Sequence, residues 1–228
     1  MRIYYIRHAQ SHNNALFVET QSRVGRHADP ELTTTGRQQA EVLANFLLDN
    51  RDDYHIDVLY CSLMQRAIQT AMPIARNLNI SLLGLLDTHE SGGVYQDDEL
   101  TNEPVGLPGF TPDELKTKYP ELSLPEDLDD RGWWNRPFET VQERVDRANR
   151  LIEALKDRHH DRNHVIALIS HQGFFNHFFF GLLGLTRPTN YWFTLNNVSI
   201  SCMDIIGDDV NAVYVNRLDH LRPELITW

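Results

Sequence analysis

Three runs of mostly apolar residues, rich in β-branched and aromatic side chains, constrain the fold of this chain most strongly. They are IYYI (3–6), DVLYC (57–61) and VIALIS (165–170). Each run is continuous rather than alternating, which is typical of parallel strands covered on both faces. Helical patterns separate the runs, so strands and helices alternate along the chain. This order predicts an α/β fold, a three-layer α/β/α sandwich with a mostly parallel central sheet.

The segments between the runs have the spacing of amphipathic helices. Apolar residues recur at helical spacing in RQQAEVLANFLLDN (37–50) and in the long PFETVQERVDRANRLIEALKD (137–157). A further helix is expected over 64–78, with a break or a start near Pro73, because proline disrupts a helix interior. Late in the chain, two alternating stretches flank GDD (207–209), which predicts a hairpin and an antiparallel edge strand.

Residues 91–135 interrupt this alternation. The segment is rich in glycine and proline, and only TPDELKTKY has a clear helical signature. There, Thr111 and Glu114 form a capping box and Pro112 occupies the first helical position. Long irregular segments of this kind often cover active sites. We therefore predict one domain over 1–228, with an insertion at about 91–135 that packs over the main body.

Composition excludes several classes of protein. The 228 residues carry 21 basic against 32 acidic side chains, a net charge of −11, whereas nucleic-acid binding needs rows of lysine and arginine. Two cysteines, Cys61 and Cys202, exclude a disulfide framework and fit a reducing compartment. The most apolar stretch, 174–185, would span only about 18 Å as a helix, less than the ~30 Å core of a membrane. With no recognisable targeting segment, we expect a cytoplasmic protein that binds neither nucleic acid nor membranes.

The side chains best suited to binding a phosphate follow the predicted strands. These are two arginines and two histidines: Arg7, His8, Arg66 and His171. In an open α/β sheet, ligands bind beyond the carboxyl ends of the strands. Arginine can bind two phosphate oxygens at once, and a neutral imidazole is a competent nucleophile at neutral pH. Convergence of these four side chains from three elements would create a phosphate site.

Four motifs around these residues resemble those of one family, in the same order. RHAQSHNN (7–14) resembles the RHG[EQ][ST]xxN signature of the histidine phosphatase superfamily, which also contains the cofactor-dependent phosphoglycerate mutases. DPELTTTGRQQA (29–40), CSLMQRAIQTA (61–71) and SHQGF (170–174) resemble its later motifs. The resemblance extends from residue 2 to about residue 175. It implies the phosphoglycerate mutase-like branch of that superfamily.

The resemblance also implies a catalytic role for each matching residue. His8 matches the histidine that attacks phosphorus and becomes phosphohistidine, which splits one difficult displacement into two easier ones. Three further residues match those that hold the phosphoryl oxygens and stabilise charge in the transition state: Arg7, Arg66 and His171.

Three more residues match substrate-binding positions of the family. Asn14 matches an asparagine that donates to a phosphate oxygen, and Ser11 matches a nearby hydroxyl. Gln10 occupies a position where family members carry Glu or Gln. An alternative without a ligand is that Asn14 caps a loop and Ser11 caps the next helix.

A proton donor is also needed, because phosphoryl transfer to His8 expels an alkoxide. In the mutase-like branch this donor is a glutamate after the third strand, and the resemblance points to Glu90 in LLDTHESGGVYQ. Asp87 is the competitor, although the two glycines that follow Glu90 resemble the family neighbourhood. His12 and His89 are close in sequence to these motifs, and we expect both to be ordinary loop histidines.

One position departs from the family pattern. Ala9 replaces the glycine that usually follows the nucleophile, where a missing side chain lets the backbone approach the phosphate. One methyl group is tolerated if φ is negative, whereas a positive φ would put the activity in doubt. A non-catalytic binding protein on the same fold is therefore the alternative outside the enzymes.

Two reactions remain open within the resemblance. A phosphatase passes the phosphoryl group to water, whereas a mutase returns it to another hydroxyl. Nothing in the chain closely matches the long substrate-covering insert and tail of the glycolytic mutases. We therefore expect a phosphoric monoester hydrolase that acts on a small phosphorylated substrate without a cofactor or a metal, and keep mutase-type transfer as the alternative.

Most of the negative charge lies in one segment. Residues 97–130 carry eleven acidic side chains against two lysines, so −9 of the total −11 is located there. The rest of the chain is nearly neutral, and the predicted pocket is locally positive. If this segment covers the site, its acids should favour small or singly phosphorylated substrates. Trp133 and Trp134 in the same region would either line the leaving-group pocket or anchor the segment in the core.

Overall fold

The central element of the computed structural model is a mixed sheet with the strand order β6-β3-β2-β7-β1-β8-β9. The structure describes residues 1–159, 161–185, 190–207 and 209–228. The strands of this sheet are β1 (Arg2–Arg7), β2 (Val58–Cys61), β3 (Leu82–Gly84), β6 (Leu122–Ser123), β7 (Val165–Ser170), β8 (Ile200–Ile206) and β9 (Asp209–Arg217). The first five are mutually parallel, and β8 and β9 are antiparallel to their neighbours.

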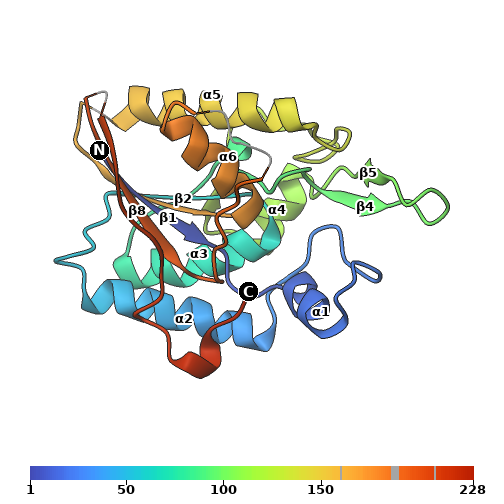
Figure 1. Cartoon of the computed structure of the whole chain (residues 1–228), viewed down its shortest axis with the longest axis horizontal. Helices are drawn as coiled ribbons and strands as arrows, with labels where there is room; N and C mark the ends of the chain where they lie inside the picture. Colours follow the sequence, from blue (N-terminus) through green and yellow to red (C-terminus); the bar gives the residue numbers. More distant parts are fainter. Residues whose placement is uncertain (160, 186–189, 208) are drawn as a thin grey trace.

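Helices cover both faces of this sheet (Figure 1). The helices of the described chain are α1 (His12–Thr20), α2 (Thr34–Asp49), α3 (Gln65–Leu78), α4 (Pro112–Lys118), α5 (Val141–His159) and α6 (Gln172–Leu182), with short 3-10 turns η1 (Leu86–Thr88) and η2 (Pro223–Leu225). In Figure 1, α2 and α3 lie on one side of the sheet, and α5 and α6 lie on the other. The predicted three-layer α/β/α sandwich is therefore confirmed.

Strand β1 is buried on both faces, which accounts for its continuous apolar sequence. Tyr4 and Ile6 point into the core beneath α2 and α3, whereas Ile3 and Tyr5 point into the core beneath α5 and α6. Successive side chains of a strand face opposite sides of a sheet, so a strand covered on both sides needs an apolar residue at every position.

Helix α3 differs from the sequence-based expectation. It runs without interruption from Gln65 to Leu78 and includes Pro73 in its interior, so the predicted break or start there is wrong. Residues on both sides of the proline, Ile68 and Ile74 among them, are fully buried. Burial of this long apolar face offsets the roughly 3 kcal/mol cost of an interior proline.

The predicted hairpin is present as β8 and β9. Strand β8 pairs antiparallel with β1, and β9 pairs antiparallel with β8 at the edge of the sheet. Asp208 of the predicted turn lies outside the described residues. No helix within the described ranges has both the length and the apolar character that crossing a membrane requires.

Residues 91–135 form a small structure of their own and also extend the main sheet. Strands β4 (Tyr95–Asp97) and β5 (Pro104–Gly106) make an antiparallel ribbon that projects beside α1 (Figure 1). Helix α4 starts at the predicted capping box, since Thr111 and Glu114 cap each other's backbone. After it, β6 pairs with β3 and becomes the edge strand. Sequence reasoning had anticipated only the helix.

Candidate active site

The carboxyl ends of three parallel strands meet at one edge of the sheet. In the register of β1 and β7, Arg7 is opposite Ser170, and in that of β2 and β7, Cys61 is opposite Ile169. A pocket of about 300 Å³ opens beyond this edge. Six residues predicted from the sequence line it: Arg7, His8, Ser11, Asn14, Arg66 and Glu90.

His8 has one ring nitrogen fixed by the backbone and the other directed to an arginine. Its Nδ1 lies 2.7 Å from the carbonyl oxygen of Ala9, which can only accept, so Nδ1 carries the proton. Nε2 is then the unprotonated nitrogen, and it accepts from Nε of Arg66 at 3.1 Å. Burial, together with the charges of Arg66 and Arg7, holds the pKa of His8 well below its ordinary value. The ring is therefore neutral at pH 7, with its lone pair at Nε2.

Ala9 fits this site without backbone strain. It is fully buried, it does not have a positive φ, and its N–H donates to Thr70 Oγ1 at 3.0 Å. The geometric doubt raised by the missing glycine is thereby removed, because alanine adopts a negative φ freely.

The two arginines are buried and fixed by different partners. Arg7 donates through Nη1 to the carbonyl of Leu195 and, at 3.4 Å, to Gln172 Oε1. Burial lowers the pKa of Arg7 to about 10, which still leaves it charged at neutral pH. Arg66 Nη1 lies 3.6 Å from Asp29 Oδ1. The Asp29 carboxylate also accepts a hydrogen bond from the backbone N–H of Gln65 at the start of α3. Burial raises the pKa of Asp29 to about 6, against the opposing effect of Arg66.

His171 lies beside the nucleophile candidate. Its ring centroid is 5.0 Å from that of His8, and its Nε2 is 2.9 Å from Ser62 Oγ. The residue occupies the N-cap position of α6, directly after β7. Burial holds the pKa of His171 well below its ordinary value, so this ring is also neutral at pH 7.

Glu90 reaches the same pocket from the segment after η1. Its carboxylate accepts hydrogen bonds from the backbone N–H groups of Ser91, Gly173 and Phe174 at 2.7, 3.1 and 2.9 Å. Two of these donors belong to the first turn of α6, where N–H groups have no partner within the helix. The start of α6 therefore fixes the Glu90 carboxyl group at the pocket wall.

The competing acid points elsewhere. Asp87 does not line the pocket, and its Oδ1 lies 3.5 Å from Nη2 of Arg150 on the exposed side of α5. Position alone thus favours Glu90 over Asp87 as the carboxyl group next to His8.

Ser11 and Asn14 cap helix α1 and also line the pocket. Ser11 Oγ accepts from the Asn14 N–H at 3.3 Å, and Asn14 Oδ1 accepts from the Ser11 N–H at 3.0 Å. Because Oδ1 is occupied, Asn14 can offer its amide N–H group to a ligand. Gln10, in contrast, does not line this pocket. It accepts from Thr33 Oγ1 at 2.7 Å and joins the first motif to the start of α2.

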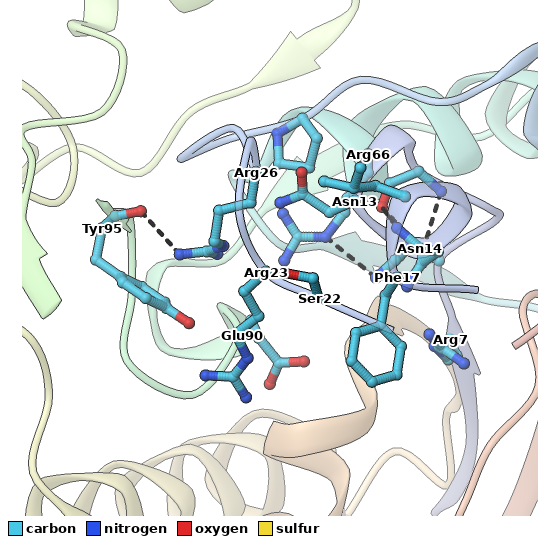
Figure 2. Close-up of a pocket in the computed structure, with 14 residues that line it drawn as sticks. Arg7, Asn13, Asn14, Phe17, Ser22, Arg23, Arg26, Arg66, Glu90 and Tyr95 are labelled. Carbon is cyan, nitrogen blue, oxygen red and sulfur yellow. Dashed lines mark hydrogen bonds between the residues drawn. The ribbon is translucent and has the colours of Figure 1, made fainter. Parts of the chain in front are cut away.

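Sequence reasoning missed a second pair of arginines. Arg23 and Arg26 lie on the loop after α1 and line the pocket together with Tyr95 of β4. Arg26 donates to the Tyr95 carbonyl at 3.1 Å, and its Cζ lies 3.9 Å from the centre of that ring. Figure 2 shows Arg26 and Tyr95 on one side of the pocket and Arg7, Asn14 and Phe17 on the other. The sequence signal for them is two arginines in one loop, fewer than twenty residues after His8.

Several other candidates lie outside the pocket. His89 is buried against Trp134, with ring centroids 4.5 Å apart, and His12 is exposed at the start of α1. Trp133 and Trp134 are 1% and 3% exposed and belong to the core, which favours the anchoring role. Four acidic residues of the 97–130 segment do not line it: Glu126, Asp127, Asp129 and Asp130.

Comparison with known proteins identifies the family of this chain. The model of the histidine phosphatase superfamily (branch 1) matches residues 3–217. Phosphoserine phosphatase 1 of Hydrogenobacter thermophilus is 27% identical over 212 residues, which covers 88% of this chain and 85% of that protein.

Solved structures share the fold. The alpha-ribazole phosphatase from Shigella flexneri superposes with a TM-score of 0.66 at 21% identity, covering 95% of this chain and 96% of that one. A phosphoserine phosphatase from Entamoeba histolytica, in complex with 3-phosphoglyceric acid, superposes with a TM-score of 0.63 at 22% identity. The match covers 97% of this chain and 99% of that one. Since the family model spans nearly the whole sequence, the chain belongs to branch 1 of the histidine phosphatase superfamily.

Proposed function

We propose that this protein is a phosphoric monoester hydrolase that works through a phosphohistidine on His8. The observation that carries the proposal is the neutral, buried imidazole with its lone pair at Nε2, next to Arg7 and Arg66. A tautomer fixed in this way presents a nucleophile at neutral pH without prior loss of a proton. The membership in the superfamily supports the same chemistry.

In the first half-reaction, His8 Nε2 attacks phosphorus as the bond to the leaving oxygen breaks. In this proposal Arg7 and Arg66 stabilise the negative charge on the phosphoryl oxygens, and His171 and the Asn14 amide donate further hydrogen bonds to them. The departing alkoxide takes a proton from the Glu90 carboxyl group. No metal or cofactor has a role in this proposal, because the arginines supply the positive charge.

In the second half-reaction, water attacks the phosphohistidine. Glu90, now a carboxylate, accepts the proton from that water, and the N–P bond breaks to release inorganic phosphate and neutral His8. The same carboxyl group thus serves as acid and then as base, and its fixed position at the start of α6 suits both steps.

The pocket supports a small phosphorylated substrate with a second negative group. Among the described residues, four arginines and one acidic side chain, Glu90, line its walls. Arg7 and Arg66 lie at the nucleophile, whereas Arg23 lies on the outer loop, and within the described residues its guanidinium has no hydrogen bond or ion pair. A carboxylate beyond the phosphate would fit there. Because two of the similar proteins are named as phosphoserine phosphatases, phosphoserine is the first substrate to assay.

The test compares wild type with His8→Ala on an aryl phosphate and on phosphoserine. We expect phosphate release by wild type and loss of about 10³-fold or more in the variant. Brief incubation and a quench in alkaline detergent should trap a phosphoprotein in wild type only, and later treatment with acid should release its phosphate. Equal rates for the two proteins would exclude His8 as nucleophile. Transfer to an added hydroxy acid in preference to water would instead indicate the mutase reaction.

A further inference from the structure

A buried ion pair lies directly behind the segment that carries Glu90. Arg147 of α5 and Glu139, which precedes that helix, are 1% and 5% exposed. Arg147 Nε lies 2.6 Å from Glu139 Oε1, and Nη2 lies 2.8 Å from Oε2, so the pair is bidentate. Neither residue lines the pocket of His8, and the proposed mechanism uses neither.

The pair binds the backbone on both sides of Glu90. Arg147 Nη1 donates to the carbonyl of Asp87 at 2.8 Å and to that of His89 at 3.0 Å. On the other side, the N–H of Gly92 donates to Glu139 Oε2 at 3.2 Å. Three backbone groups within six residues are thus held by one ion pair.

Arg147 also contacts the second support of Glu90. Its Cζ lies 4.1 Å from the ring centre of Phe174, and the backbone N–H of Phe174 donates to Glu90 Oε1. The loop that carries the carboxyl group and the helix turn that holds it therefore pack against the same guanidinium.

Stability alone is a poor explanation for this arrangement. Taking two charges out of water is costly, and well-packed apolar residues often replace a buried ion pair without loss of stability. What apolar residues cannot supply is a planar fork that binds a carboxylate and two carbonyl oxygens in fixed directions. The geometry of the pair is suited to holding the backbone around Glu90 in one orientation.

We propose that Arg147 and Glu139 are positioning residues that set the Glu90 carboxyl group for proton transfer to the leaving group. The inference rests on the proposed function, in which Glu90 is the general acid. A shift of about 1 Å in a catalytic group can cost on the order of 100-fold in rate, so a support of this kind controls activity without touching substrate.

The decisive variant is Arg147→Lys, which retains the charge opposite Glu139 and loses the fork to the two carbonyls. An alkyl phosphate needs the acid, whereas p-nitrophenolate leaves without one. The value of kcat/KM reports only the steps up to loss of the leaving group. We expect kcat/KM to fall about 10- to 100-fold for phosphoserine and to change less than about threefold for p-nitrophenyl phosphate.

A double-mutant cycle separates positioning from a general structural effect. In the Glu90→Gln background there is no acid left to position, so Arg147→Lys should cause little further loss with phosphoserine. Arg150→Met is the matched control, because Arg150 lies on the same helix and, among the described residues, forms its one ion pair with the side chain of Asp87, at 3.5 Å and on the surface. It should keep the wild-type ratio of the two substrates.

Two outcomes would overturn the inference while leaving the proposed function intact. One is an equal fall in kcat/KM for both substrates. The other is that Arg147→Lys lowers kcat/KM for phosphoserine in the Glu90→Gln background as much as it does in wild type. If Arg147→Lys does not fold, Glu139→Gln takes its place, since it keeps the shape and removes one charge, and the same criteria apply. A wild-type protein that hydrolyses neither substrate would instead refute the proposed function.

Discussion

Gly173 leaves the space that the Glu90 carboxyl group occupies. A Cβ atom built on Gly173 would overlap Glu90 Oε1 and lie 3.0 Å from its Cδ, closer than most Cβ contacts in proteins. The glycine stands in the first turn of α6, and its own N–H donates to Glu90 Oε2 at 3.1 Å. The SHQGF motif therefore supplies both the second histidine of the site and the space for the carboxyl group.

Gly173→Ala should therefore displace Glu90 and reduce proton donation. We expect kcat/KM for an alkyl phosphate to fall about 10- to 100-fold while that for p-nitrophenyl phosphate stays within about threefold. Gly181→Ala on the same helix is the control, because its Cβ would meet the movable end of Asn149 at 2.9 Å. An unchanged alkyl rate in Gly173→Ala would show that the space beside Glu90 is not required.

Asp29 provides a prediction about the charge next to Arg66. Asp29→Asn keeps an acceptor for the Gln65 N–H and removes the negative charge 3.6 Å from Arg66. In the proposed function Arg66 binds phosphoryl oxygens common to all substrates, so we expect kcat/KM to fall about tenfold for aryl and alkyl phosphates alike. Glu31→Gln, at a nearby half-buried acid that pairs with Arg37 and Lys118, should have little effect.

The pH dependence of this variant gives an independent check. Burial raises the pKa of Asp29 to about 6, so the wild-type side chain becomes neutral, like asparagine, as the pH falls below that value. The ratio of wild-type to Asp29→Asn activity should therefore shrink toward one between pH 7 and pH 5. A ratio independent of pH would remove Asp29 from this role.

Buried histidines should make the protein less stable in acid. Burial lowers the pKa of His8, His89 and His171, so below pH 6.5 the unfolded chain binds protons that the folded chain does not. Each such proton lowers the free energy of unfolding by about 1.4 kcal/mol per pH unit as the pH falls. Asp29, with its raised pKa, acts in the opposite direction between its unfolded value and about 6. Burial also lowers the pKa of His159 and His220, so five histidines against one carboxyl group predict a net loss.

Urea unfolding followed from pH 7.5 to pH 5 measures this slope. His89→Gln removes one buried imidazole that lies outside the proposed catalytic set, and the slope should become shallower by about 1.4 kcal/mol per pH unit. A free energy of unfolding that is constant over this range would contradict the assignment of neutral, buried rings.

The features that sequence reasoning predicted are those with long or periodic signals. Continuous apolar runs identified β1, β2 and β7, and capping residues identified α4. In contrast, β3, β4, β5 and β6 contain only two or three residues each, which is too short for a period to be recognised. Their positions depend on partners distant in the chain.

Within the site, the nucleophile and its immediate partners followed from motifs, whereas the supporting residues did not. Arg147 occurs in the highly charged VQERVDRANR stretch, where an arginine is usually solvated, yet tertiary packing buries it almost completely. Glu139 precedes the helix by two residues and has no local signature. Burial that depends on distant segments cannot be deduced from local spacing.

The last prediction concerns substrate choice at the outer loop. Phosphoserine and phosphoethanolamine differ only by a carboxylate, which makes them a matched pair for a test of Arg23. If this guanidinium binds the carboxylate, Arg23→Gln should lower kcat/KM for phosphoserine about 10-fold or more and leave phosphoethanolamine within about twofold. Arg37→Gln, an exposed arginine that pairs with Glu31 outside the pocket, serves as control. Equal losses for both substrates would mean that Arg23 acts on the phosphate or on the loop itself. If Arg23→Gln keeps the full preference for phosphoserine, the carboxylate binds elsewhere. Arg26, which already donates to the Tyr95 carbonyl, would then be the next side chain to replace.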